Sequence, residues 1–305
     1  MTKFFSKVYS YGNLTMFSHT VFLAPFGLIG MMWANGGVLP SWYTLALIVA
    51  ALVFAQNGTS ASNRIIDRHI DNRNPRTVTR PLQTGAVSLR GAWIVSLVCL
   101  VALTFCAWQL NTLCLALLPL ALLFFIGYSY TKRFTWLCHF VLGVACGGAP
   151  VGAWAAVTGG LTLTPFVLGA AVTFWVAGFD IIYATQDIDF DRANKLHSVP
   201  ARFGKNHALA ISACSHAASV GLLCVLALTR GWWFAVGVAC VGGLLFLERV
   251  MTLTNRRVNF IAYNMNAIVS LTFMFFGLLD ILWNVSAPWN TWLPWVTDLL
   301  EVTLL

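Results

Sequence analysis

The sequence predicts an all-α polytopic membrane protein with nine transmembrane helices and a cytosolic N-terminus. Three observations support this fold class. The chain of 305 residues is 59% hydrophobic and 9% charged, with a mean hydropathy of +0.77, whereas a soluble domain carries roughly a quarter charged residues. Apolar runs of membrane-spanning length recur along the chain. The basic residues fall almost entirely on one side of those runs.

Nine apolar segments are long enough and poor enough in charge to cross the hydrocarbon core of a bilayer. Very few residues separate the third from the fourth, or the seventh from the eighth, so each of these pairs is expected to form a tight helical hairpin. The predicted spans are 16–34, 43–62, 91–110, 112–130, 136–157, 165–186, 207–228, 231–248 and 262–284.

The positions of Lys and Arg predict the orientation. If nine spans start from a cytosolic N-terminus, seventeen of the eighteen Lys and Arg residues are cytosolic, and only Arg230 falls on the other side. This asymmetry is the one that the positive-inside rule describes. Membrane topology therefore accounts for the net charge of +8 better than binding to nucleic acid does.

No soluble domain is visible in the sequence. Residues 1–284 are expected to form a single transmembrane domain, and residues 285–305 an interfacial tail at the outer face. Trp289, Trp292 and Trp295 in this tail suit the headgroup region of a membrane.

The fifth span contains two pairs of glycines spaced four residues apart. They are Gly143 with Gly147 and Gly148 with Gly152. Small residues at this spacing allow neighbouring helices to approach closely, so both pairs are predicted to pack against other helices.

Two short acidic stretches, each directly after an apolar run, contain five of the ten carboxylates. Asn63, Asp67 and Asp71 follow the second span at steps of four residues, so on a helix they share one face. Asp187 and Asp191 repeat this spacing after the sixth span. Acidic groups at a membrane boundary are costly unless something cationic lies against them. We therefore predict that the two stretches face each other and hold a divalent metal for a diphosphate.

Carboxylates suit Mg²⁺, which proteins hold through a few carboxylates together with water and the phosphates of a substrate. The sequence contains no His/Cys cluster that would indicate a softer metal. Basic side chains near the acidic stretches can bind phosphate oxygens. Those expected to do so are Arg76, Arg80, Arg133, Lys195 and Arg202.

The remaining acids leave other interpretations open. Asp180 lies two helical turns before Asp187 on the same face, Glu248 is interpreted as a solvated loop charge beside Arg249, and Asp280 lies deep in the ninth span. The acidic stretches can also be solvated helix ends. A transporter is the alternative of another class, because transporters place coupling acids near the bilayer midplane. Acids at cytosolic helix ends flanked by arginines count against transport.

Several motifs together resemble a known family. Asn63-xxx-Asp67-xxx-Asp71, followed by Arg76-Thr77-x-x-Arg80-Pro81-Leu82 and Gly85, resembles the first signature of the UbiA superfamily of intramembrane aromatic prenyltransferases. Tyr183-xxx-Asp187-xxx-Asp191 is similar to its second signature. The stretch Tyr-Thr-Lys-Arg-Phe-Thr at 130–135 resembles a basic loop of the 4-hydroxybenzoate prenyltransferase branch. The resemblance covers nearly the whole chain and implies a UbiA-like bundle.

This resemblance implies a Mg²⁺-dependent polyprenyltransferase in the inner (cytoplasmic) membrane, with its active site towards the cytosol. The enzyme would transfer the polyprenyl group of a polyprenyl diphosphate to an aromatic acid in ubiquinone or menaquinone biosynthesis. Asn63 and the four aspartates would hold the metal, and Lys132 and Arg133 would contact the diphosphate. The implied catalytic residues are Asp67, Asp71, Asp187, Asp191 and Arg133.

The sequence departs from the family pattern at positions that bear on the acceptor. Arg64 follows Asn63, where many members carry Asp, and the first span lacks the Arg and Lys-Pro pair expected of ubiquinone-type enzymes. The Ser-His-Thr…Pro-Phe run from Ser18 to Phe26 and Asn-Pro-Arg-Thr at 74–77 resemble the branch of menaquinone synthesis through futalosine, whose acceptor would be 1,4-dihydroxy-6-naphthoate. His19, Asp180 and Tyr183 are the residues implied for the aromatic acceptor. A prenyltransferase acting on haem or a chlorophyll precursor is the alternative enzyme.

Overall fold

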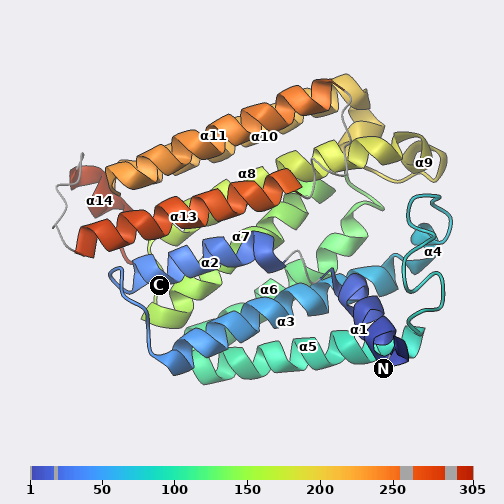
Figure 1. Cartoon of the computed structure of the whole chain (residues 1–305), viewed down its shortest axis with the longest axis horizontal. Coiled ribbons are helices and arrows are strands. Elements are labelled where there is room, and N and C mark those ends of the chain that lie inside the picture. The colour runs from blue at the N-terminus through green and yellow to red at the C-terminus, as the bar shows by residue number, and fades with distance from the viewer. Residues whose placement is uncertain (1, 17–19, 255–263, 286–293, 305) are drawn as a thin grey trace.

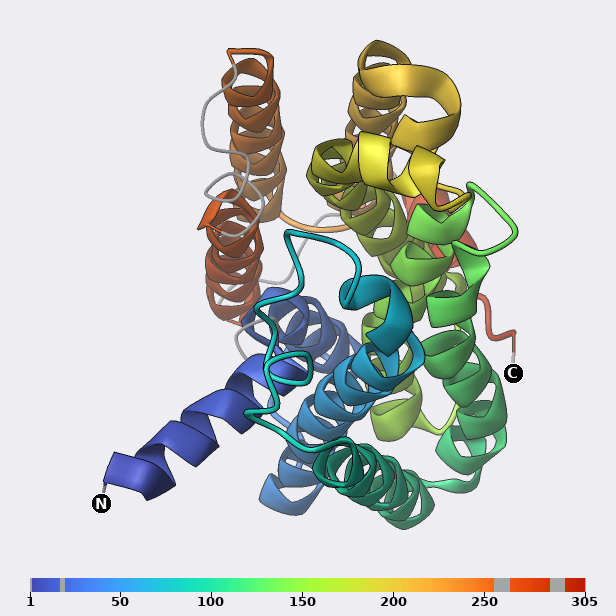
Figure 2. The same ribbon diagram turned by 90° about the vertical axis from the view of Figure 1, so that its right-hand side faces the viewer.

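The computed structural model is a bundle of long helices that run side by side (Figure 1; Figure 2). It describes residues 2–16, 20–254, 264–285 and 294–304. The α-helices are α1 (Thr2–Thr15), α2 (Thr20–Ala34), α3 (Trp42–Ile66), α4 (Arg68–Asp71), α5 (Leu89–Leu110), α6 (Thr112–Thr131), α7 (Cys138–Thr158), α8 (Leu163–Ala184), α9 (Ile188–Ala193), α10 (Val199–Ala227), α11 (Trp232–Leu253), α13 (Asn266–Val285) and α14 (Pro294–Leu300). A short 3₁₀ helix, η2 (Thr185–Asp187), joins α8 to α9. The predicted all-α fold is confirmed.

Within the described residues, eight helices are long and apolar enough to cross a membrane, and they correspond to the second to ninth predicted spans. The described part of the first predicted span contains α2, whose apolar stretch, Phe22–Ala34, is shorter than these. The count of nine spans and the cytosolic N-terminus remain predictions. The helix α1 was not predicted, and it projects away from the bundle (Figure 2).

The α5–α6 hairpin shows how the sequence sets helix ends. Asn111 alone separates the two helices, and its side chain accepts a hydrogen bond from the backbone N–H of Cys114 at 2.9 Å, which caps α6. The Asn111 amide also donates to the backbone carbonyl of Ala155 on α7 at 2.8 Å. The predicted tight hairpin is therefore present, and the residue that forms it also ties it to α7.

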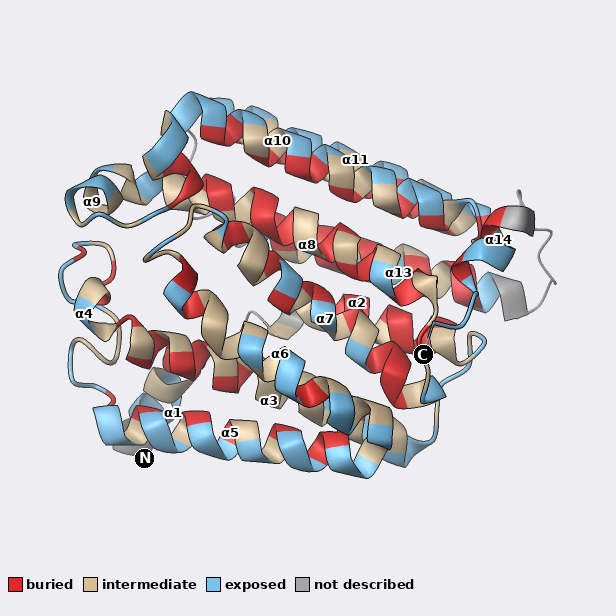
Figure 3. Ribbon diagram, turned by 180° about the vertical axis from the view of Figure 1, so that it is seen from behind, coloured by how far each residue is buried: buried red, intermediate tan, exposed pale blue. Residues whose placement is uncertain are grey.

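The helix α8 lies at the centre of the bundle, packed against α7 on one side and α10 on the other (Figure 3). Gly143 and Gly147 allow α7 to approach it, because a Cβ on either glycine would lie 2.3 Å from a backbone oxygen of α8. The same prediction was wrong for Gly148 and Gly152, where a Cβ would meet nothing within 4 Å. These two glycines face the cavity described below.

Two acidic residues outside the acidic stretches are buried in the bundle. Glu248 is 0% exposed and not a loop charge, because α11 continues to Leu253 instead of ending at 248. Asp280 accepts hydrogen bonds from the backbone N–H groups of Gly231 and Phe234, both at 3.0 Å. It thereby caps the N-terminus of α11.

Candidate active site at one end of the bundle

A cavity of about 480 Å³ extends to residues of α4 and α9, which lie at the same end of the bundle (Figure 1). Helices α2, α3, α5, α6, α7 and α8 all contribute to its wall. Charged side chains gather at the α4 and α9 end, and the remainder of the wall is mostly apolar, with Ala and Leu the commonest residues. The charged residues on the wall are Arg64, Asp67, Asp71, Arg76, Arg80, Lys132, Asp180, Asp187 and Asp191.

The first acidic stretch begins at the end of α3. Asp67 is 3% exposed and interrupts the helix, with φ −90° and ψ 1°, but its backbone N–H still donates to Asn63 at 2.9 Å. Its Oδ2 accepts from the Lys132 ammonium at 2.6 Å and from the Asn63 amide at 3.0 Å. Asn63, Asp67 and Asp71 all line the cavity despite this break.

The loop after α4 contacts both acidic stretches. Asp71 pairs with Arg80 at 2.6 Å. Further along the same loop, the Asn74 amide donates to Asp187 Oδ1 at 3.0 Å, and Arg76 Nε donates to the same oxygen at 2.9 Å. The Arg76 Nη2 also pairs with Asp187 Oδ2. All four aspartates line one cavity, and the loop that follows the first stretch contacts Asp187 of the second. That the two stretches hold a metal between them remains a prediction.

The second acidic stretch follows α8 through η2 into α9. Asp187 ends η2, and Asp191 accepts a hydrogen bond from Ser198 Oγ at 2.7 Å. Tyr183 precedes them on α8, and its hydroxyl accepts a hydrogen bond from Arg76 at 2.6 Å. Asp189 lies between the two acids, but it is exposed and is not among the cavity residues.

The donor set at this cavity mouth suits Mg²⁺. Among the residues that the structure describes, no three His, Cys, Asp or Glu side chains lie together closely enough to hold a metal on their own. The aspartates instead form ion pairs or hydrogen bonds with Lys132, Arg80, Arg76 and Ser198. Mg²⁺ often binds through only one or two carboxylates and takes its other ligands from water and substrate phosphates. The residues present therefore fit a metal that arrives with a diphosphate.

Not every predicted phosphate-binding residue lies on the cavity wall. Arg76, Arg80 and Lys132 do. Arg133 donates to the carbonyl of Ile66 at 2.8 Å and to Asp67 Oδ1 at 3.4 Å, and it lies outside the cavity wall. Lys195 and Arg202 are exposed and also lie outside the wall. Their binding roles remain predictions.

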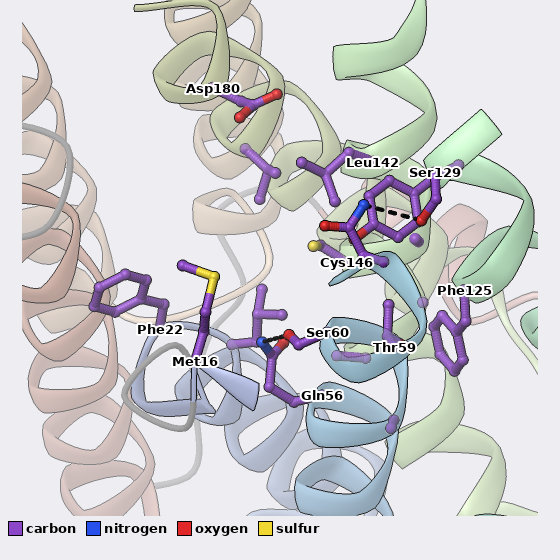
Figure 4. A pocket seen from close by; sticks show the side chains of 18 of the residues that line it. Met16, Phe22, Gln56, Thr59, Ser60, Phe125, Ser129, Leu142, Cys146 and Asp180 are labelled. Atoms are coloured by element: carbon purple, nitrogen blue, oxygen red, sulfur yellow. Dashed lines mark hydrogen bonds between the residues drawn. The ribbon is translucent and has the colours of Figure 1, made fainter. Parts of the chain in front are cut away.

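Two of the three residues implied for the aromatic acceptor lie on the cavity wall. Asp180 and Tyr183 line the cavity, and Figure 4 shows Asp180 at one end of the pocket, with Leu142 and Cys146 of α7 nearby. The third, His19, lies outside the described residues.

Three residues of the cavity wall were not identified as site residues from the sequence. Asn74 belongs to the Asn-Pro-Arg-Thr stretch, whose similarity to a known branch was the only signal for it. Arg64 was noted only for the acid that it replaces, yet it is buried in the cavity wall. His139 is a lone histidine in an apolar run, and its partner Asp180 lies 41 residues away.

Comparison with known proteins supports the same assignment. The model of the UbiA prenyltransferase family matches residues 23–276. The chain is 30% identical over 230 residues to a 4-hydroxybenzoate octaprenyltransferase of Herminiimonas arsenicoxydans, covering 72% of this chain and 80% of that protein. It is 34% identical over 188 residues to a 4-hydroxybenzoate solanesyltransferase of Synechocystis, covering 59% of this chain and 63% of that protein.

Solved structures agree in fold. The apo structure of a UbiA homologue from Aeropyrum pernix superposes with a TM-score of 0.80 at 35% identity, covering 87% of this chain and 98% of that one. A homologue from Archaeoglobus fulgidus, solved with DMAPP and Mg²⁺, shares the fold with a TM-score of 0.67 at 20% identity, covering 90% of this chain and 99% of that one. This chain belongs to the UbiA prenyltransferase family and is a membrane-embedded prenyltransferase.

Proposed function

We propose that this protein transfers a polyprenyl group from a polyprenyl diphosphate to an aromatic acid, with Mg²⁺, in quinone biosynthesis. The observation that carries this proposal is that one cavity holds both acidic stretches at its mouth and has a mostly apolar wall beyond them. A diphosphate with a long isoprenoid tail has the same division between charged head and apolar tail.

The charged mouth provides separate groups for metal and for phosphate. Asp67, Asp71, Asp187 and Asp191, supported by Asn63, would hold Mg²⁺, which supplies positive charge to the diphosphate as its allylic C–O bond breaks. The cations now paired with these carboxylates would then turn to the phosphate oxygens. They are Lys132, Arg76 and Arg80, all on the cavity wall. Arg133, Lys195 and Arg202 would assist from outside the wall.

The apolar part of the cavity suits a long tail. On α3 the wall runs from Asp67 to Ile48, a rise of about 28 Å at 1.5 Å per residue. This length approaches the roughly 30 Å thickness of a bilayer's hydrocarbon core. The apolar walls would also keep water away from the allylic cation until the ring attacks it.

Two aromatic acids are candidates for the acceptor. The named relatives act on 4-hydroxybenzoate, whereas the features of this chain's first span favour 1,4-dihydroxy-6-naphthoate. Both molecules carry a carboxylate, and Arg64, 8% exposed on the cavity wall, provides a guanidinium that can pair with it. Asp180 and Tyr183 would line the same pocket, and His19 stays a candidate from the sequence alone.

The proposed active site also implies an orientation of the protein in the membrane. The mouth with α4 and α9 would face the cytosol across the inner membrane, and residues 285–305 would lie at the outer face. At the end of the bundle away from the mouth, Arg230 lies 3.8 Å from Glu301, and the backbone N–H of Leu304 donates to Leu161 at 2.7 Å. These contacts hold the end of the chain against the start of α8.

The test uses membranes that contain the protein, with Mg²⁺, octaprenyl diphosphate and each candidate acceptor in turn. A prenylated ring should form with one of the two aromatic acids, and EDTA, Asp67→Asn or Asp187→Asn should abolish it. Asp189→Asn is the matched control, because this carboxylate belongs to the same stretch but lies outside the cavity wall. Full turnover of Asp187→Asn would contradict the proposed metal site, and prenylation of haem or a chlorophyll precursor alone would contradict the proposed acceptor.

A further inference from the structure

His139 and Asp180 form a hydrogen-bonded pair inside the cavity. The distance from His139 Nδ1 to Asp180 Oδ2 is 2.6 Å. The imidazole comes from the first turn of α7 and the carboxylate from near the C-terminal end of α8. The His139 side chain is 4% exposed and that of Asp180 is 27% exposed, and both residues line the cavity.

The second nitrogen of His139 defines the tautomer. The backbone N–H of Val199 donates to His139 Nε2 at 3.3 Å, so Nε2 carries a lone pair. In a neutral imidazole the hydrogen is then on Nδ1, which donates to Asp180. His139 therefore occupies Oδ2 as a donor and holds the carboxylate in one orientation, which leaves Oδ1 as the oxygen that can take up a proton.

The position of Asp180 along α8 matches the place of the acceptor ring. Asp180 precedes Asp187 by seven residues, a rise of roughly 10 Å at 1.5 Å per residue. An aromatic ring between the allylic carbon and the apolar wall would lie at this depth, beyond the diphosphate. Tyr183 lies one turn nearer the mouth, and its hydroxyl accepts a hydrogen bond from Arg76 at 2.6 Å, so it stands between the acceptor pocket and the diphosphate.

We propose that Asp180 is the base that removes the proton from the prenylated ring, and that His139 is its positioning residue. This inference rests on the proposed function. The allylic C–O bond breaks and its electron pair leaves with the diphosphate. A π pair of the ring then forms the new C–C bond. The attacked carbon still carries its hydrogen, and as that proton passes to Asp180 Oδ1 the C–H pair restores the aromatic ring.

The test compares acceptors with hydrogen or deuterium at the ring carbons that are attacked. Asp180→Asn keeps the size of the side chain but is a poor base. We expect its kcat to fall by about 100-fold or more, as for other general bases, with an isotope effect on kcat that the wild type lacks. KM for the polyprenyl diphosphate should stay within about threefold, because the metal-binding carboxylates are untouched.

The His139 variants separate positioning from folding. His139→Leu removes the donor and should approach Asp180→Asn in rate and isotope effect. His139→Asn restores an N–H near the position of Nδ1 and should recover most of the rate. Controls are Asp189→Asn and His207→Leu, both exposed, with thermal unfolding followed for every variant.

Each outcome decides one question. Asp180→Asn with wild-type kcat, or with a reduced kcat but no isotope effect, would overturn the assignment of the base. If His139→Asn is as slow as His139→Leu, the positioning role is wrong. A wild-type protein that prenylates no aromatic acceptor would instead overturn the proposed function together with this inference.

Discussion

Gly148 and Gly152 keep the apolar part of the cavity open, and their replacement should set the length of prenyl chain that the enzyme accepts. Both glycines line the cavity, with nothing within 4 Å of an added Cβ. Measured along α7 from His139, Gly148 lies at about 14 Å, Gly152 at about 20 Å and Ala156, the last α7 residue on the wall, at about 26 Å.

A leucine at either position would fill the cavity at that depth. Gly148→Leu should leave about half of the length along α7 and Gly152→Leu about three quarters. Both variants should fold, because leucine favours a helix over glycine by up to about 1 kcal/mol and its side chain enters empty space.

The assay is kcat/KM for geranyl, farnesyl and octaprenyl diphosphate in membranes. Gly148→Leu should lower the value for the octaprenyl donor by more than about tenfold, equivalent to about 1.4 kcal/mol, and Gly152→Leu should lower it less. Neither variant should lower kcat/KM for geranyl diphosphate. Gly221→Leu, on an exposed position of α10, is the matched control. An equal loss for all three donors, or no loss for the octaprenyl donor, would refute the assignment of the groove.

Three further changes test other parts of the structure. Gly147→Ala should lower the unfolding temperature, since overpacking costs about 1–3 kcal/mol, whereas Gly148→Ala should not; equal temperatures would contradict the close α7–α8 contact. Asp280→Ala should destabilise the protein by about 1–3 kcal/mol for each backbone donor left without a partner, and leave the Mg²⁺ dependence of turnover unchanged; a changed Mg²⁺ dependence would show that Asp280 does more than cap α11. Arg64→Leu should raise KM for an aromatic acid acceptor by about tenfold or more, but should leave KM unchanged for the same acceptor with its carboxylate replaced by an amide. The exposed Arg90→Leu is the control. The same rise in KM for both acceptors would exclude a contact between Arg64 and the carboxylate.

That both acidic stretches line one cavity was predictable from the sequence because the signals are local. Steps of four residues place acids on one face, and the cost of charge at a membrane boundary demands a cation. The hairpin at Asn111 was also predictable, because this one residue separates two apolar runs of membrane-spanning length. The spacing of Asp67 and Asp187 in the chain, however, says nothing about which side chain neutralises each. Lys132 and Arg76 emerged as the partners only from the structure.

The parts that sequence reasoning missed depend on contacts between distant helices. Glu248 is followed by Arg249 and resembles a loop charge, yet its helix continues past it and buries it against the bundle. Gly148 follows Gly147 and has the same four-residue spacing to a second glycine. A shift of one residue turns it about 100° around the helix, from the α8 contact to the cavity. The role of His139 could not be inferred from the sequence, because its partner Asp180 comes from another helix.

The most direct test of the account is a crystal structure with Mn²⁺ in place of Mg²⁺ and a prenyl thiodiphosphate that cannot ionise readily. Anomalous scattering would locate the metal. We expect Mn²⁺ bound by carboxylates of both stretches, with Asp67 or Asp71 on one side and Asp187 or Asp191 on the other, and the thiodiphosphate between them. Metal bound to only one stretch, with the other still paired to its arginine or lysine, would contradict it.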